Sequence, residues 1–194
     1  MEHPLIITIS RTYGSRGRDI GMQLAKELGI DFYGKQELMA LARQTPDYKQ
    51  VRAFYEEQPV TSLLFAIAVE HSTTVRGDLP FAAIRKLTDG KSFVMVEQCG
   101  SYIFRDSPRC LRLFIHAPVT TRAEHRSRVE NIPTHKILRA VQAHDRERSA
   151  FHRYYTSEEW GRAEVYDLCL SSDALGVEGT VQFIKDYLKR RGMI

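Results

Sequence analysis

A short stretch near the start of the chain, TISRTYGSRGRDIG at residues 8–21, combines positive charge with glycine. Its charged residues are Arg11, Arg16, Arg18 and Asp19, and its glycines are Gly14, Gly17 and Gly21. Guanidinium groups offer forked N–H donors that suit phosphate oxygens, and glycines lower the steric cost of tight turns. An apolar run precedes the stretch and a helical pattern follows, so free backbone N–H groups and a helix dipole would add to the charge. These features predict an anion-binding loop.

The loop lacks the Gly-Lys-Ser/Thr ending of the common triphosphate-binding motif. Three interpretations stay open: a phosphate loop that uses arginine, a loop that has lost its nucleotide, and a plain strand-to-helix turn with solvated arginines. The chemistry favours phosphate binding over the plain turn. The candidate nucleotide- or phosphate-binding residues are Arg11, Tyr13, Gly14, Ser15, Arg16, Gly17, Arg18 and Asp19.

The elements that must position this loop alternate between strand and helix. Apolar runs rich in β-branched residues predict buried strands, and apolar residues three or four positions apart predict helices. Because helices separate the strands, we expect a parallel sheet covered on both faces, with ligands bound at the carboxyl ends of the strands. The loops after Ser10, Glu97, His116 and Ser172 are therefore the expected site. The predicted strands are 4–10, 30–34, 92–97, 110–117 and 166–172, and the predicted helices are 19–28, several within 35–90 (including TSLLFAIAVEH) and 179–191.

Length and composition describe a globular chain. Its 194 residues suggest one domain, and its net charge of +4 fits an anionic ligand. No apolar run reaches the roughly 20 residues of a membrane helix, and no basic segment precedes the first apolar run, so neither a membrane span nor a signal peptide is expected. The three cysteines are scattered without metal-ligand spacing, and we expect reduced, mostly buried thiols and a cytoplasmic protein.

At the level of motifs, the sequence resembles the cytidylate kinase-like family of P-loop nucleoside monophosphate kinases. Ile7 to Gly21 resembles the family's opening signature, and Leu24 to Tyr33 continues the match. FVMVEQCGSYIFRDSPRCLRLFIHAP is similar to its third and fourth strand region, AHDRERSAFHRYYTSEEWG to its lid, and YDLCLSSDALG to its fifth strand.

The resemblance implies a three-layer α/β fold with a central, mostly parallel five-stranded sheet, a helical acceptor region and a helical lid. It divides the single domain into a core (1–34, 76–117 and 163–194), an acceptor-side region (35–75) and an arginine-rich lid (118–162). The implied reaction moves the γ-phosphoryl group of ATP, with Mg²⁺, to a nucleoside monophosphate such as CMP or to a similar small acceptor.

Two departures from the family pattern bear on catalysis. Gly17 stands where true cytidylate kinases have the loop lysine, so Arg16 or Arg18 would have to supply its charge. Asp19 stands near their magnesium-binding hydroxyl, where it is either a metal ligand or a carboxylate that favours the first turn of a helix.

The second departure follows the third strand, where Glu97 and Gln98 replace the family's Gly-Arg. The loss of the arginine weakens the case for binding an acceptor phosphate. Glu97 would hold a magnesium-bound water or act as a base, or it would serve as a hydrogen-bonded structural carboxylate or repel a phosphate.

Within the expected lid, Arg122 and Arg126 are one helical turn apart, and Asp145 and Arg148 are three residues apart. Lid guanidinium groups can stabilise charge on a moving phosphoryl group, although charges on a solvated helix face often contribute little. The resemblance makes Arg18, Arg122, Arg148, Asp145 and Glu97 the catalytic candidates. We interpret Tyr154, Tyr155 and Trp160 as packing residues, and His144 and His152 as surface or helix-packing residues.

Three classes of function compete. A cytidylate kinase-like enzyme leads, and a non-catalytic nucleotide- or phosphate-binding protein on the same fold is the alternative, because the two departures leave phosphoryl transfer open. Nucleic-acid binding is disfavoured because the sequence has no recognised nucleic-acid module. The expected partner is a small-molecule nucleotide, with no membrane contact, and a homodimer stays open.

Overall fold

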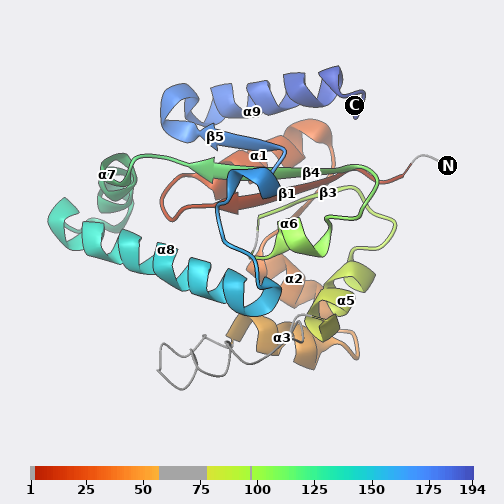
Figure 1. The fold of residues 1–194 in the computed structure, drawn as a ribbon. Helices are drawn as coiled ribbons and strands as arrows, with labels where there is room; N and C mark the ends of the chain where they lie inside the picture. The colour runs from red at the N-terminus through yellow and green to blue at the C-terminus, as the bar shows by residue number, and fades with distance from the viewer. Residues whose placement is uncertain (1–2, 57–77, 97) are drawn as a thin grey trace.

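The computed structural model describes residues 3–56, 78–96 and 98–194 (Figure 1). Five strands form one sheet in the order β2-β3-β1-β4-β5, and every neighbouring pair is parallel. The predicted five-stranded sheet is confirmed, and it is parallel throughout. The strands are β1 (Ile6–Arg11), β2 (Asp31–Tyr33), β3 (Phe93–Met95), β4 (Cys110–His116) and β5 (Leu168–Ser171).

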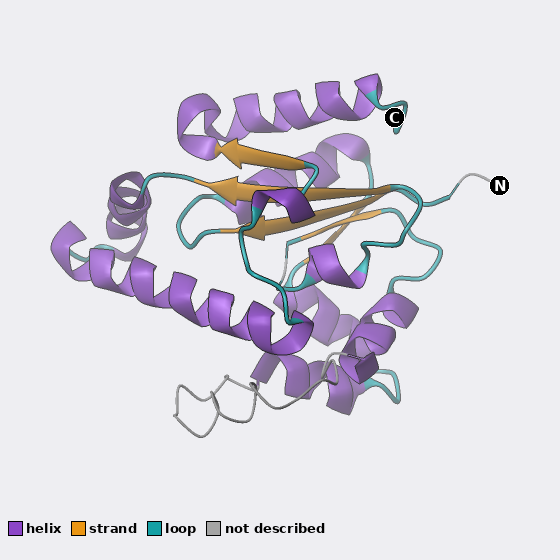
Figure 2. Cartoon of the chain, viewed as in Figure 1, coloured by secondary structure: helices purple, strands orange, loops and turns teal. Residues whose placement is uncertain are grey.

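Helices make the connections between the strands and cover the sheet (Figure 2). Residues 57–77, which include the predicted helix TSLLFAIAVEH, lie outside the described residues. The helices are α1 (Gly17–Leu28), α2 (Lys35–Ala42), α3 (Tyr48–Glu56), α5 (Asp78–Leu87), α6 (Gly100–Ile103), α7 (Val119–Glu130), α8 (Thr134–Thr156), the short 3-10 helix η1 (Ala163–Val165) and α9 (Ser172–Arg190).

Strand β1 contributes to two interiors, because successive side chains of a strand point to opposite faces of the sheet. Ile7 and Ile9 are fully buried in a cluster with residues of α1 and α9. Ile6 belongs to a second cluster, which includes residues of α2, α3, α5 and α8. The two clusters are the boundaries between the three layers of the fold, and the predicted three-layer architecture is confirmed.

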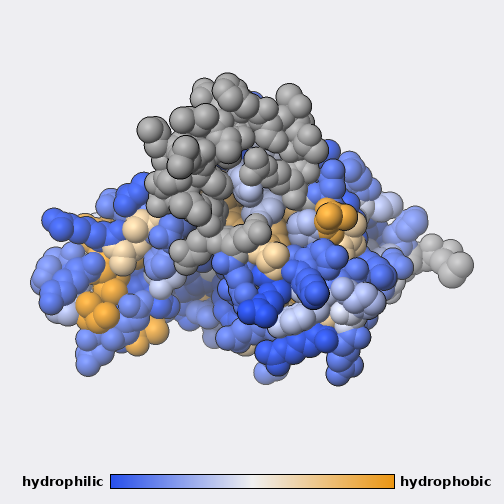
Figure 3. Space-filling view, turned by 90° about the horizontal axis from the view of Figure 1, so that it is seen from below, coloured by the Kyte–Doolittle hydropathy of each residue, from blue (hydrophilic) through white to orange (hydrophobic). Residues whose placement is uncertain are grey.

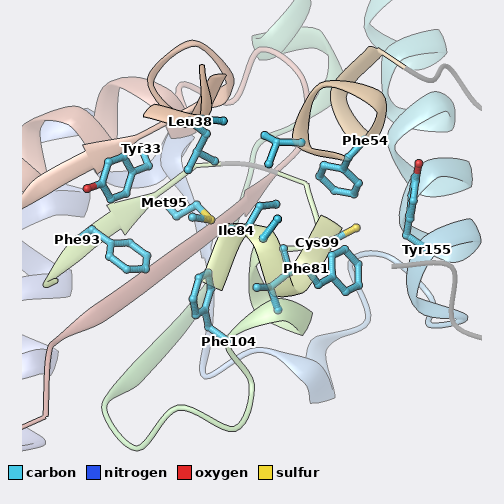
Figure 4. Close-up of a cluster of buried hydrophobic side chains, with 14 of the residues drawn as sticks. Tyr33, Leu38, Phe54, Phe81, Ile84, Phe93, Met95, Cys99, Phe104 and Tyr155 are labelled. Atoms are coloured by element: carbon cyan, nitrogen blue, oxygen red, sulfur yellow. The ribbon is translucent and has the colours of Figure 1, made fainter. Parts of the chain in front are cut away.

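Aromatic side chains dominate the second cluster (Figure 4). The Phe54 ring makes edge contacts with Phe81, Phe151 and Tyr155, at centroid distances of 5.8, 5.1 and 4.8 Å. Rings of α3, α5 and α8 therefore pack together beside β3, since aromatic pairs favour such edge geometry. This packing fixes the carboxyl-terminal half of α8 against the rest of the domain, and Tyr155 has the packing role that the sequence predicts.

Helix α9 differs from its predicted range. The sequence predicts residues 179–191, whereas α9 begins at Ser172 and passes through Gly176, whose φ of 64° and ψ of −172° are not helical. Apolar periodicity resumes only after this kink, so the pattern could not reveal the first turn. Cys169 is a second correction: it is exposed, Cys99 is buried and Cys110 is partly buried, so the thiols are not mostly buried.

The surface of the described chain is largely hydrophilic where Figure 3 views it. Exposed apolar side chains do occur, among them Val129 and Ile132 at the end of α7. Among the described helices, none is both long and apolar enough to cross a membrane.

Candidate phosphate-binding site

The predicted anion loop lies between β1 and α1, at the carboxyl end of the central strand. Ser15 is buried, and its hydroxyl donates to the carbonyl of Thr12 at 2.8 Å. The Ser15 carbonyl in turn accepts a 2.7 Å hydrogen bond from the Ser172 hydroxyl at the start of α9. These contacts fix the loop against neighbouring strand ends, as expected for a preorganised site.

Gly14 allows α7 to approach the loop closely. Its φ is 82°, and a Cβ atom at this position would lie 3.0 Å from the carbonyl oxygen of Arg122. Both the backbone conformation and this spacing favour glycine. The glycine that the sequence singles out for phosphate approach thus also forms the contact between loop and α7.

The start of α1 offers unpaired hydrogen-bond donors. Arg16, which precedes the helix, has a left-handed backbone (φ 60°) and its side chain does not cap the helix. Within the described part of the chain, the first-turn N–H groups of Gly17, Arg18 and Asp19 have no backbone or side-chain acceptor. Unpaired N–H groups at the positive end of a helix form an anion-binding site.

The three loop arginines occupy different places. The Arg11 side chain follows the α1 face of β1, and its Cβ lies 2.7 Å from where a Cβ of Gly17 would be. Arg16 pairs with Asp19 at 3.0 Å, and both side chains are about half exposed. Arg11 and Arg16 are thus beside the start of α1, where their charge adds to the helix dipole.

Arg18 points away from the loop. Its guanidinium pairs with Glu37 of α2 at 3.0 Å and lies 5.0 Å from the centre of the Phe32 ring. Burial opposes ionisation of the Glu37 carboxyl, but hydrogen bonds from backbone N–H groups and the Arg18 guanidinium outweigh it and lower the pKa of Glu37. The role of Arg18 at a phosphate remains a prediction, since the side chain would have to leave Glu37 to reach one.

Two residues of the arginine-rich helices α7 and α8 hold the loop backbone. Arg122 is buried and donates to the carbonyls of Ala117 (2.9 Å) and Tyr13 (2.8 Å) and to the carboxylate of Asp145 (2.6 Å). Asp145 also accepts a 2.7 Å hydrogen bond from the Tyr13 N–H. Arg122 and Asp145 thus bond to partners within the protein. This geometry is typical of residues that position the loop, and not of groups that contact a phosphate.

Other charged residues of α7 and α8 gather around the Tyr13 ring. The guanidinium carbons of Arg126 and Arg148 lie 4.9 and 5.5 Å from its centre, and the His144 ring is 4.3 Å away. Arg148 also donates to the Arg11 carbonyl at 3.0 Å, and Glu130 pairs with Arg126. The sequence does not place α7 and α8 against Tyr13, but the structure brings most of the predicted cationic residues to this one loop.

The second departure from the family pattern, Glu97 and Gln98 after β3, is only partly covered by the described residues. Glu97 lies outside the described residues, so its predicted role stays a prediction. Gln98 is described, and its buried Oε1 atom has no hydrogen-bond partner in the described part of the chain. Trp160 makes an edge contact with Phe114 of β4 at 5.4 Å, in keeping with its predicted packing role.

His144 and His152, both on α8, occupy different environments. His144 is exposed, pairs with Glu147 and contacts Tyr13. His152 is only 1% exposed, so the packing interpretation holds for it and the surface one does not. Sequence reasoning did not assign His152 or Ser172 to the site; the signal for His152 was its helical spacing of four and seven residues from Arg148 and Asp145.

Comparison with known proteins decides the family. A family model described as cytidylate kinase-like matches residues 6–174. The chain belongs to the cytidylate kinase-like family. The family and the fold support a kinase-like, nucleotide-binding function. No curated protein matches the sequence.

Solved structures agree with this family on the fold. An uncharacterized protein from Eubacterium ventriosum is 26% identical, with a TM-score of 0.73 over 96% of this chain and 98% of that one. A gluconokinase from Sinorhizobium meliloti is 15% identical, with a TM-score of 0.51 over 98% of this chain and 99% of that one. A shikimate kinase from Acinetobacter baumannii, in complex with shikimate, is 16% identical, with a TM-score of 0.51 over 97% and 94%. The two kinases share the P-loop kinase fold with this cytidylate kinase-like protein, and at these identities they show the fold alone.

Proposed function

We propose that this cytidylate kinase-like protein is an ATP-dependent phosphotransferase that moves the γ-phosphoryl group of ATP to a nucleoside monophosphate or a similar small acceptor. One observation carries the proposal: the first-turn N–H groups of α1 are unpaired, and Arg11 and Arg16 lie beside them. A site of this kind binds a phosphate chain through backbone donors and fixed charge.

In this proposal, the residues act mainly by position and charge, as phosphoryl transfer requires. The N–H groups at the start of α1 bind the phosphate chain, and Arg11 and Arg16 replace the charge of the missing lysine. Arg122 and Asp145 hold the loop in shape. Arg148, which contacts the Arg11 carbonyl at the end of β1, is the candidate for stabilising the transferred group.

The described residues can bind the phosphates of ATP without rearrangement, whereas binding of Mg²⁺ would require an ion pair to open. In nucleotide sites, Mg²⁺ uses one or two carboxylates together with phosphate oxygens and water. Asp19 can supply one carboxylate at the start of α1, but Arg16 holds it at 3.0 Å. Metal binding would therefore exchange this half-exposed ion pair for coordination. Mg-ATP would supply the phosphoryl group and part of the charge neutralisation.

A non-catalytic nucleotide-binding protein is the second candidate. Two observations favour it: Arg18 is paired with Glu37 rather than with the loop, and Asp19 is paired with Arg16. A protein that retains the phosphate loop but lacks the lysine would bind nucleotide without transferring phosphate.

A coupled kinase assay with Mg-ATP and CMP, dCMP, UMP or AMP separates the two candidates, with calorimetry of ATP binding alongside. Transfer to any of the four supports the phosphotransferase. Tight ATP binding without transfer supports the second candidate, and the absence of any ATP binding contradicts both.

Variants locate the phosphate contacts. Arg11→Ala and Arg16→Ala should each weaken ATP binding roughly tenfold to a hundredfold, the value of a charge-assisted hydrogen bond. Arg191→Ala, just beyond the end of α9, is the matched control and should bind ATP normally. The Arg18→Ala variant tests the sequence prediction for that residue: an ATP affinity equal to wild type would remove Arg18 from the site.

A further inference from the structure

Several buried polar atoms of the described residues have no hydrogen-bond partner. They include the hydroxyl oxygen of Thr12, Oε1 of Gln98 and both ring nitrogens of His152. Most buried polar atoms in proteins have a hydrogen-bond partner, and an exception calls for an explanation. A ligand that supplies the missing partners is one such explanation.

His152 is on the face of α8 that contacts the anion loop. It is four residues after Arg148, which donates to the Arg11 carbonyl, and seven after Asp145, which accepts from the Tyr13 N–H. Residues at these spacings share one face of a helix. His152 therefore continues, toward the domain interior, the row of side chains that begins at the loop.

Strand β1 presents hydroxyl groups to the same side. Thr8 and Ser10 alternate with Ile7 and Ile9, whose side chains face α1 and α9. A Cβ atom on Gly100, the first residue of α6, would lie 3.5 Å from Cβ of Thr8. The hydroxyl row thus faces the layer that contains α6.

Two further groups join this hydroxyl row. The Tyr166 hydroxyl interacts with the side chains of Ser10 and Ser101, and Gln98 directly precedes Cys99 and α6 in the chain. Polar side chains from β1, α6 and the segment before β5 therefore lie together on this side of the sheet.

The gathered groups are uncharged. Burial lowers the pKa of His152 to about 4, so at neutral pH its ring has one N–H donor and one acceptor nitrogen. Threonine, tyrosine and glutamine side chains likewise both donate and accept. Such groups match hydroxyl, carbonyl and amide groups of a ligand, whereas the arginines around the anion loop match phosphate.

We propose that His152, on the face of α8 that contacts the anion loop, binds the uncharged part of the phosphoryl acceptor, namely the sugar hydroxyls or the base of a nucleotide. This inference rests on the proposed phosphotransferase function and names an acceptor-recognition residue within it. Unpaired buried polar groups destabilise a protein by themselves, and functional sites commonly keep them at the expense of stability.

The first test needs no enzymatic activity. Replacing His152 with leucine removes two unpaired nitrogens from the interior, so His152→Leu should raise the melting temperature of the ligand-free protein by roughly 2–4 °C. His135→Leu, at an exposed histidine near the start of α8, is the matched control and should change it little. A lower melting temperature for His152→Leu would show that His152 is satisfied internally and would overturn the proposal.

The second test measures binding of CMP, cytidine and ribose 5-phosphate by calorimetry. His152→Leu should weaken binding of CMP on the order of tenfold, the value of one lost buried hydrogen bond, and leave ATP binding unchanged. His152→Gln, which keeps a donor and an acceptor, should recover part of the loss. If His152→Leu weakens binding of cytidine but not of ribose 5-phosphate, His152 contacts the base; if it weakens binding of both, His152 contacts the sugar. Either result supports the proposal, and unchanged binding of all three probes contradicts it.

The two proposals fail in different ways. A wild-type protein that binds CMP through His152 but transfers no phosphate contradicts the phosphotransferase and supports the role of His152. A wild-type protein that transfers phosphate while His152→Leu keeps the wild-type affinity and KM for CMP contradicts the role of His152 alone. Failure of the wild type to bind any of the three probes overturns this inference.

Discussion

At the scale of single residues, the ion pair between Arg122 and Asp145 is the structural centre of the candidate site. Their side chains are 8% and 18% exposed. Between them they bond the Tyr13 carbonyl and N–H of the loop, the Ala117 carbonyl after β4, and each other. The family resemblance suggested catalytic roles for both. The contacts instead favour a role in loop geometry, which affects catalysis through the position of the phosphate donors.

Arg122→Ala should lower the free energy of unfolding by about 3 kcal/mol, because it leaves the Asp145 carboxylate largely buried and without its cation. Urea unfolding would measure this loss. Arg162→Ala, which breaks an exposed pair with Glu164, is the control and should cost less than about 1 kcal/mol. Equal effects of the two substitutions would contradict the structural role of Arg122.

His152 should make stability depend on pH. Its pKa is about 4 in the folded protein and near 6.5 when unfolded, so between these values the unfolded chain binds more protons. Folding stability should therefore fall as the pH drops from about 6.5 to about 4, by up to about 3 kcal/mol from this residue. The cause is burial, which penalises the charged ring.

Urea unfolding of wild type and His152→Gln across this pH range would test that expectation. The variant should lose less stability at acid pH than the wild type. His135→Gln should keep the wild-type dependence, because its side chain is in solvent. An identical pH dependence for all three proteins would contradict the expectation.

At the scale of elements, the loop and α7 depend on each other through Gly14. Gly14→Ala should cost about 1–3 kcal/mol from its positive φ and its close contact with the Arg122 backbone, and it should weaken ATP binding. Gly29→Ala at the end of α1 is a useful control, since φ is 66° there but no atom lies within 4 Å of the added Cβ. Equal losses of stability in urea unfolding would show that loop–α7 packing contributes nothing.

The sequence predicted strands and helices well where the pattern of apolar residues along a segment matches the structure that the segment forms. FVM is apolar and fully buried, CLRLFIH buries its leucines, Phe114 and Ile115, and both segments form parallel strands. The loop could be recognised as an anion site because its glycines and arginines are adjacent in sequence. The contacts that hold it could not, because Tyr13 and Asp145 are separated by more than a hundred residues. The burial of His152 likewise depends on how α8 packs, which its own sequence does not specify.

At the scale of the whole molecule, the arginine-rich helices are part of the folded core as well as of the site. Residues in the middle of α8 contact the loop, and residues near its carboxyl end contact the Phe54 ring. Trp160, the single tryptophan of the chain, follows α8 and packs against β4. We therefore expect α8 and the sheet to unfold together.

Chemical unfolding should accordingly appear as one transition. Trp160 fluorescence and far-ultraviolet circular dichroism should give coincident curves, as two-state unfolding requires. Two separated midpoints would show that α8 and its surroundings open before the sheet.

The alternation of side chains along β1 also limits how the gene can change. Ile7 and Ile9 fill one interior while Thr8 and Ser10 face the other. Inserting or deleting a single residue within the strand would exchange these two sets, placing hydroxyls in the apolar core and isoleucines beneath α6. A substitution at one position of β1 can cost little or much stability, depending on the residue introduced. A change in the number of residues in β1 should always be costly. Among diverged relatives with this site, length variation should therefore be found in the connecting loops and not in this strand.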